Sequence, residues 1–156
     1  MGVADAKSKL NKYVYLEMEY NNNKDRLARL ENDRELPAMQ EGDGSQRSLL
    51  KTSRMENAAI RKMMQEKRIT QRLEAICDDL AEIEDAVDML TDPMQKEVIR
   101  LRYMDCEYCK HTRWNDVAKS IYGDDEEKHL LAIWRIHSHA LLELEKIFSE
   151  QEKNAS

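Results

Sequence analysis

Glycine, proline and phenylalanine are scarce: the chain has four, two and one of them among its 156 residues. Proteins built from sheets need turn residues and aromatic or β-branched strands. Here aromatic residues make up only 6% of the chain, whereas charged residues make up 36%. This composition predicts an all-α protein with long, charged helices. The length limits it to one domain, or one small domain with a helical extension.

Long apolar runs are also absent. No window approaches the roughly 18 consecutive apolar residues that a membrane-spanning helix requires. The first ten residues, MGVADAKSKL, contain no apolar run typical of a secretory signal. Position 6 is alanine, where an N-myristoylation signal has serine or threonine. We therefore expect a cytoplasmic protein with no membrane partner.

Sequence signatures of catalysis and of cofactor binding are missing as well. The chain has no glycine-rich phosphate loop, no H-E-x-x-H motif and no nucleophile elbow, and its carboxylates lie in solvated charge runs. We expect a protein that is not an enzyme and that takes no cofactor. The net charge of -6 excludes a globally basic nucleic-acid binder, although it leaves room for a local basic patch.

Cysteine is rare, but two of the three cysteines form a C-x-x-C pair. Cys106 and Cys109 are followed by His111. A structural zinc site needs four ligands, so a distant histidine (His129, His137 or His139) or a second chain would have to complete it. A redox motif would follow a strand, and no strand is indicated. We interpret the segment as a loop with reduced thiols, with zinc as the alternative.

What the chain does have is heptad periodicity. Seven aliphatic residues occupy consecutive a and d positions: Ile69, Leu73, Ile76, Leu80, Ile83, Val87 and Leu90. A similar pattern runs from residue 10 to about residue 36, with Tyr13, Leu16, Tyr20, Asn23, Leu27 and Leu30. We predict an antiparallel, coiled-coil-like helical hairpin over 7–90, with a loop near 37–52. Either the first helix or a second copy of the chain, in a homodimer, covers the 69–90 seam.

A second module is predicted over 91–149. Asp92 and Pro93 suit the N-cap and the first position of a helix that runs to about Met104. A short helix follows, with one apolar face and with Gly123 at its end. That face is formed by Trp114, Val117, Ala118 and Ile121. A long helix then reaches about Ser149, and we expect residues 150–156 to be a disordered tail.

The apolar positions of this second module resemble region 4 of bacterial sigma factors. The matching residues are Leu101-Arg102-Tyr103, then Trp114, Val117, Ala118 and Ile121, then Ile133, Ile136, Ala140, Leu141 and Leu144. With a helical hairpin ahead of it, the chain is similar to phage-encoded sigma-like regulators, the RinA and ArpU kind of late transcriptional activator. The resemblance implies a helix-turn-helix over 91–149 and a phage or prophage transcriptional regulator that binds duplex DNA, with RNA polymerase as a second partner.

Two surfaces are candidates for nucleic acid. On the second module, cations and polar residues that fit phosphate contacts are Lys110, Arg113, Asn115, Lys119, Lys128, His129, Arg135 and His139. On the hairpin, the stretch from Arg47 to Arg72 has eight basic residues against two acids: Arg47, Lys51, Arg54, Arg61, Lys62, Lys67, Arg68 and Arg72. The alternative for the first set is an ordinary solvated face. The second set could also bind an acidic partner surface, and the alternative for it is pairing with acids of the first helix and its loop.

The start of the last helix departs from the family. Leu130, Leu131 and Trp134 stand where base-reading residues are expected, and leucine cannot form the paired hydrogen bonds that read base edges. Trp134, Leu141 and Phe148 recur every seven residues, as a core or as a docking seam for a protein. This leaves a second function open, a non-catalytic inhibitor or adaptor of a host protein. A third is a phage DNA-packaging or assembly component.

Overall fold

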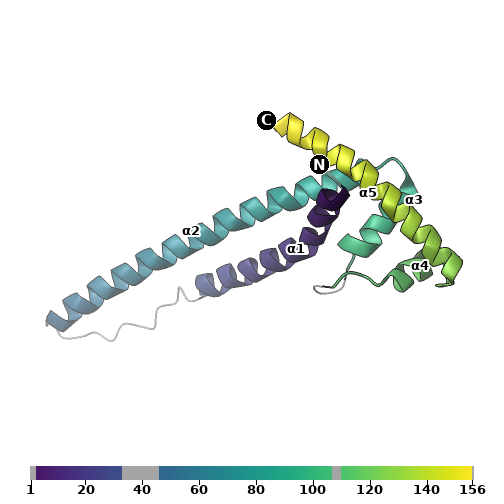
Figure 1. Ribbon diagram of the computed structural model, residues 1–156. Helices are drawn as coiled ribbons and strands as arrows, with labels where there is room; N and C mark the ends of the chain where they lie inside the picture. The colour runs from purple at the N-terminus through teal and green to yellow at the C-terminus, as the bar shows by residue number, and fades with distance from the viewer. Residues whose placement is uncertain (1–2, 33–45, 107–109, 156) are drawn as a thin grey trace. The chain divides into compact units, whose positions relative to one another are not determined.

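The computed structural model describes residues 3–32, 46–106 and 110–155 (Figure 1). They form α1 (Val3–Asn32), α2 (Gln46–Asp88), α3 (Pro93–Ile99), a π-helix η1 (Arg100–Met104), α4 (Trp114–Tyr122) and α5 (Glu127–Ala155). These ranges contain no strand, so the predicted all-α class is confirmed. None of the described helices carries an apolar stretch sufficient to cross a lipid bilayer.

The chain divides into two compact units. The core unit consists of Met1–Met18 and Asp78–Ser156, and the two-helix unit consists of Glu19–Cys77. The division differs from the predicted boundary near residue 90. The reason is that the beginning of α1 and the end of α2 share an apolar cluster with α5, so both helix ends belong to the core unit.

The larger apolar cluster of the core unit joins α1, α2, η1 and α5. Ala6 and Leu10 of α1, Val87 of α2, and Leu144 and Phe148 of α5 are all at most 1% exposed. Burial of such side chains stabilises a fold by about 1.5–3 kcal/mol for each large one. The cluster explains why α5 continues to Ala155, where we had predicted a disordered tail over 150–156.

Polar contacts hold the last turns of α5 in place. The Gln151 side-chain amide donates to the Glu82 carbonyl at 3.2 Å, and Lys9 lies 4.0 Å from a carboxylate oxygen of Glu152. The prediction for residues 150–155 was therefore wrong. The predicted loop near 37–52 is also too long, since α2 begins at Gln46.

A smaller cluster joins α3, α4 and α5. Val98, Val117, Ala118 and Ile133 are fully buried in it. The predicted start of α3 is confirmed, because the Asp92 carboxylate accepts the backbone N–H of Met94 at 2.9 Å and Pro93 follows it. This cluster fixes α4 against α5, and thereby positions the candidate site described below.

The 69–90 seam is covered within one chain. In the two-helix unit Ile76 is fully buried, and Ile69 and Leu73 are half-buried. In the core unit Ile83, Val87 and Leu90 are buried as well. In the two-helix unit Arg72 of α2 donates two hydrogen bonds to Glu19 of α1, at 2.7 and 2.9 Å. One chain therefore buries much of the seam, and a homodimer over its half-buried residues stays a prediction.

Candidate nucleic-acid interface

A four-residue connection joins α4 to α5. Gly123 ends α4 with φ +86°, a left-handed conformation that favours glycine, and its N–H donates to the Lys119 carbonyl at 2.9 Å. The predicted end of the short helix is confirmed. Two helices joined by a turn of three or four residues with a glycine is the connectivity of helix-turn-helix modules.

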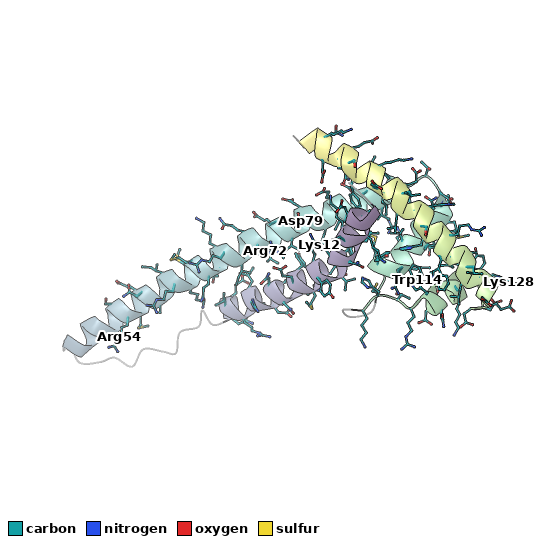
Figure 2. The ribbon with its side chains drawn as sticks, in the orientation of Figure 1. Lys12, Arg54, Arg72, Asp79, Trp114 and Lys128 are labelled. Carbon is teal, nitrogen blue, oxygen red and sulfur yellow. The ribbon has the colours of Figure 1, made fainter. Side chains whose placement is uncertain are left out.

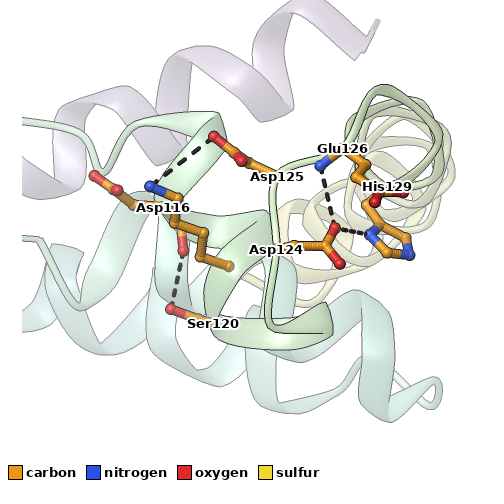
Figure 3. A network of polar contacts seen from close by, with 7 residues as sticks. Asp116, Ser120, Asp124, Asp125, Glu126 and His129 are labelled. Atoms are coloured by element: carbon orange, nitrogen blue, oxygen red, sulfur yellow. Dashed lines mark hydrogen bonds and ion pairs between the residues drawn. The ribbon is translucent and has the colours of Figure 1, made fainter.

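Asp124 organises this turn (Figure 3). Its carboxylate accepts the Glu126 backbone N–H at 3.1 Å and a hydrogen bond from Nδ1 of His129. The Glu126 N–H and then His129 hold the pKa of Asp124 below its usual value. The His129 ring also stacks on Tyr122, with 4.5 Å between ring centroids. We had predicted a DNA contact for His129, but its ring is engaged in the turn and only 21% of its side chain is exposed.

Two predicted DNA-contacting lysines lie beside carboxylates. Lys119 Nζ is 3.9 Å from an Asp125 oxygen, and Lys128 Nζ is 3.4 Å from a Glu126 oxygen. The side chains of Lys119 and Lys128 are 56% and 72% exposed, and Figure 2 shows Lys128 at the start of α5. Exposed ion pairs contribute only about 0–1 kcal/mol, so a phosphate can replace either carboxylate at small cost.

The other candidates of this surface are exposed side chains: Lys110, Arg113, Asn115, Arg135 and His139. Arg113 immediately precedes α4 and has an extended backbone, while Arg135 and His139 lie one turn apart on α5. Within the described residues, no ion pair joins Lys110, Arg113 or Arg135 to a carboxylate. We define the α4–α5 face by seven exposed residues: Lys110, Arg113, Asn115, Lys119, Lys128, Arg135 and His139.

Large apolar side chains are exposed along α5. Leu131, Trp134 and Leu142 are 51%, 45% and 48% exposed. Leu141 and Phe148 are 5% and 0% exposed in the core unit, so neither is available to dock a protein as we had predicted. Leu141 and Phe148 belong to the apolar cluster that α5 shares with α1 and α2, whereas Trp134 belongs to neither apolar cluster.

Behind α4, a buried aromatic cluster fixes the end of η1. The Tyr103 hydroxyl lies 2.7 Å from Nε2 of His137, and Trp114 packs edge-on against the His137 ring at 4.7 Å. Burial, with Lys7 and Arg102 adding positive charge, lowers the pKa of His137 to about 4. Arg102 stacks over Trp114 at 4.4 Å. His137 therefore belongs to the core.

The cysteine motif is described only in part. Cys109 lies outside the described residues, while the Cys106 thiol donates to the Arg102 carbonyl at 3.0 Å. The His111 ring packs edge-on against Tyr103, and burial lowers its pKa. The zinc alternative for Cys106, Cys109 and His111 stays a prediction.

Two clusters of ionisable side chains were missed by the sequence analysis. Asp124, Glu126 and His129 place three ligand atoms within 4.8 Å of one another, a D-x-E-x-x-H spacing that could have been noticed. The contacts of the turn, including Lys128, already occupy these groups. In the core unit, the Tyr13 hydroxyl donates to Glu84 at 2.5 Å beside Glu17.

Burial raises the pKa of Glu17, and the same burial raises the pKa of Tyr13. Glu17 and Glu84 lie 67 positions apart in the sequence, on α1 and α2. No local spacing in the sequence indicates that they meet.

The basic stretch of α2 lies in the two-helix unit. Arg54, Arg61, Lys67 and Arg68 are exposed and Lys62 is half-buried, whereas Arg72 is held by Glu19. The side chains of Arg47 and Lys51 lie outside the described part of the chain. The structure adds two residues of α1 to this surface, Arg26 and Arg29.

These arginines line a groove of about 380 Å³. Its lining residues, which we call the arginine groove, are Arg26, Arg29, Leu30, Gln65, Arg68 and Ile69. No pattern in the sequence places Arg26 and Arg29 beside Arg68, because only the pairing of α1 with α2 brings them together.

Comparison of the chain with known protein families, with curated protein sequences and with solved structures gave no match. The structural geometry alone therefore bears on the function.

Proposed function

We propose that this protein is a non-catalytic, DNA-binding transcriptional regulator that contacts duplex DNA through the α4–α5 face. The observation that supports this proposal is the connection between α4 and α5, in which Gly123 adopts a left-handed conformation and Val117, Ala118 and Ile133 share one core. In helix-turn-helix proteins the second helix enters the major groove by its N-terminal part. The equivalent part here is the start of α5.

The cations of the α4–α5 face suit phosphate binding better than base reading. Lys119 lies in α4 and Arg113 immediately precedes it, while Lys128 and Arg135 lie in α5. Contacts from both helices to one backbone would fix the orientation of the module on the duplex. Leu131 offers only apolar contact to bases, so much of the affinity would be independent of sequence.

The test is duplex binding at 50 and 200 mM salt, because each phosphate contact makes affinity fall more steeply with salt. We expect the Arg113→Glu, Arg135→Glu variant to bind more weakly and with a smaller salt dependence than the wild type. Lys12→Glu with Lys146→Glu is the matched control, since it changes the net charge equally at two exposed positions of the core unit outside the α4–α5 face. No binding of the wild type at either salt, or equal losses in both variants, would refute the proposal.

A second candidate function, binding to a host protein, is favoured by one observation. Leu131, Trp134 and Leu142 remain exposed on α5. Leu131 and Trp134 lie about one turn apart near the start of α5, and tryptophan is enriched among the residues that dominate protein interfaces. RNA polymerase is the partner we propose for this surface.

Purified bacterial RNA polymerase tests this second function. We expect Trp134→Ala to weaken the complex at least tenfold, while duplex affinity changes less than twofold. Ser138→Ala, at an exposed position one turn further along the helix, is the control. A wild-type chain that does not bind the polymerase would exclude this role for Trp134.

A further inference from the structure

We propose that the arginine groove is a second nucleic-acid site, which holds the phosphate backbone of a duplex through Arg26, Arg29 and Arg68. The site lies in the two-helix unit. It is distinct from the α4–α5 face and goes beyond the function proposed for that face.

Three guanidinium groups line one groove without carboxylate partners among the described residues. Arg26, Arg29 and Arg68 are exposed and take part in none of the described ion pairs. By contrast, Arg72 donates hydrogen bonds to Glu19, and these bonds lower the pKa of Glu19. Guanidinium groups donate paired hydrogen bonds that match phosphate oxygens. Three of them at one groove favour an anionic ligand with several phosphates.

The groove also has apolar walls. Leu30 of α1 and Ile69 of α2 are half-buried and line it between the arginines. Deoxyribose presents apolar carbon atoms between successive phosphates, so a backbone can use both kinds of surface. Gln65 adds a neutral hydrogen-bonding group at the same groove.

A row of arginines extends the groove along α2. Arg54, Arg61 and Arg68 are spaced by seven residues in one unbroken helix, so they lie on one side of it. At 1.5 Å per residue the row is about 20 Å long. Figure 2 labels Arg54 and Arg72 on α2. A row of this length suits a linear polyanion rather than a single small anion.

The chemistry of the groove favours nucleic acid over an acidic polypeptide. Its apolar walls, Leu30 and Ile69, suit the deoxyribose carbons that alternate with the phosphates of a nucleic-acid backbone. Phosphate also accepts the guanidinium fork through several oxygens at each position. The arginine groove and the row of Arg54, Arg61 and Arg68 therefore fit a duplex backbone best.

The test compares two double variants of equal net charge. Arg26→Gln with Arg68→Gln removes two groove cations, and Lys12→Gln with Lys146→Gln removes two exposed cations of the core unit. All four positions are exposed, so both variants should fold, which circular dichroism verifies. For a fluorescent duplex of mixed sequence, we expect the groove variant to reduce the slope of log affinity against log salt by about 2. The control should reduce it by less than half a unit.

A conservative variant separates hydrogen-bond geometry from charge. Arg26→Lys with Arg68→Lys keeps both charges but loses the paired guanidinium donors. We expect this variant to keep the slope of log affinity against log salt and to bind the duplex several-fold more weakly. The inference is overturned if the groove and control variants have the same slope. It is also overturned if poly-glutamate competes with the duplex at equal charge concentration, which would identify an acidic polypeptide as the ligand class.

The outcome is independent of the α4–α5 face. If the Arg113→Glu, Arg135→Glu variant loses binding and the groove variant does not, the groove inference fails and the proposed function stands. If only the groove variant loses binding, the proposed function fails and the groove inference stands.

Discussion

Acidification should destabilise the core unit through His137. Its ring is 8% exposed, its Nε2 lies 2.7 Å from the Tyr103 hydroxyl, and its pKa is lowered to about 4. A protonated ring would place a charge in this buried site, beside the positive charges of Lys7 and Arg102. Because the unfolded chain takes up a proton near pH 6.5, the unfolded state binds more protons than the folded state between those two values.

The sign follows from this difference in bound protons. Stability is unaffected by His137 above its unfolded pKa of about 6.5, and decreases as the pH falls toward the folded value. From about pH 7.5 to about pH 4.5 the two pKa values correspond to a loss of about 2 to 3 kcal/mol in the free energy of unfolding. This is a large part of the stability of a small domain.

Urea denaturation of the wild type and of His137→Gln at several pH values measures this loss. Glutamine does not titrate, so the difference between the two proteins should shrink by about 2 to 3 kcal/mol over that pH range. Contributions from other groups, such as Glu17 and His111, cancel in the difference. A constant difference for His137→Gln would refute the reasoning.

Substitutions at three further positions test the packing and the helix ends by urea denaturation. Phe148→Ala should cost about 3 to 5 kcal/mol because the ring is fully buried, and a cost below that of Trp134→Ala would contradict the described core. Gly123→Ala should cost about 1 kcal/mol from its positive φ alone, since an added Cβ meets nothing within 4 Å; Gly123→Asn should cost less. Asp92→Ala should cost about 1 kcal/mol through the lost cap, and an unchanged midpoint would exclude the cap as a stabilising contact.

Local signals in the sequence predicted helix ends well. Asp92 and Pro93 begin α3, and Gly123 ends α4, because capping and a left-handed glycine depend on a few neighbouring residues. The aliphatic seam of α2 also predicted a buried face correctly. The π-helix η1 was not predicted, because no residue type in Arg100–Met104 signals the wider turn.

Contacts between distant residues were harder to predict. The seven-residue spacing of Trp134 and Leu141 indicated one shared seam, but only the packing of α5 shows that the first is exposed and the second buried. Likewise the basic stretch of α2 was evident, whereas Arg26 joins it only once α1 lies against α2. The functions proposed for these surfaces stay predictions.

The beginning of α1 and the C-terminal half of α5 share one apolar cluster. Lys9 Nζ lies 4.5 Å from the Phe148 ring centroid, a contact that spans most of the chain. Contacts so distant in sequence form slowly, since the loop between them must close first. During synthesis, the apolar cluster that contains Ala6 and Leu10 would therefore stay incomplete until α5 has left the ribosome. The two-helix unit is continuous in sequence, so its contacts can form before this cluster is complete.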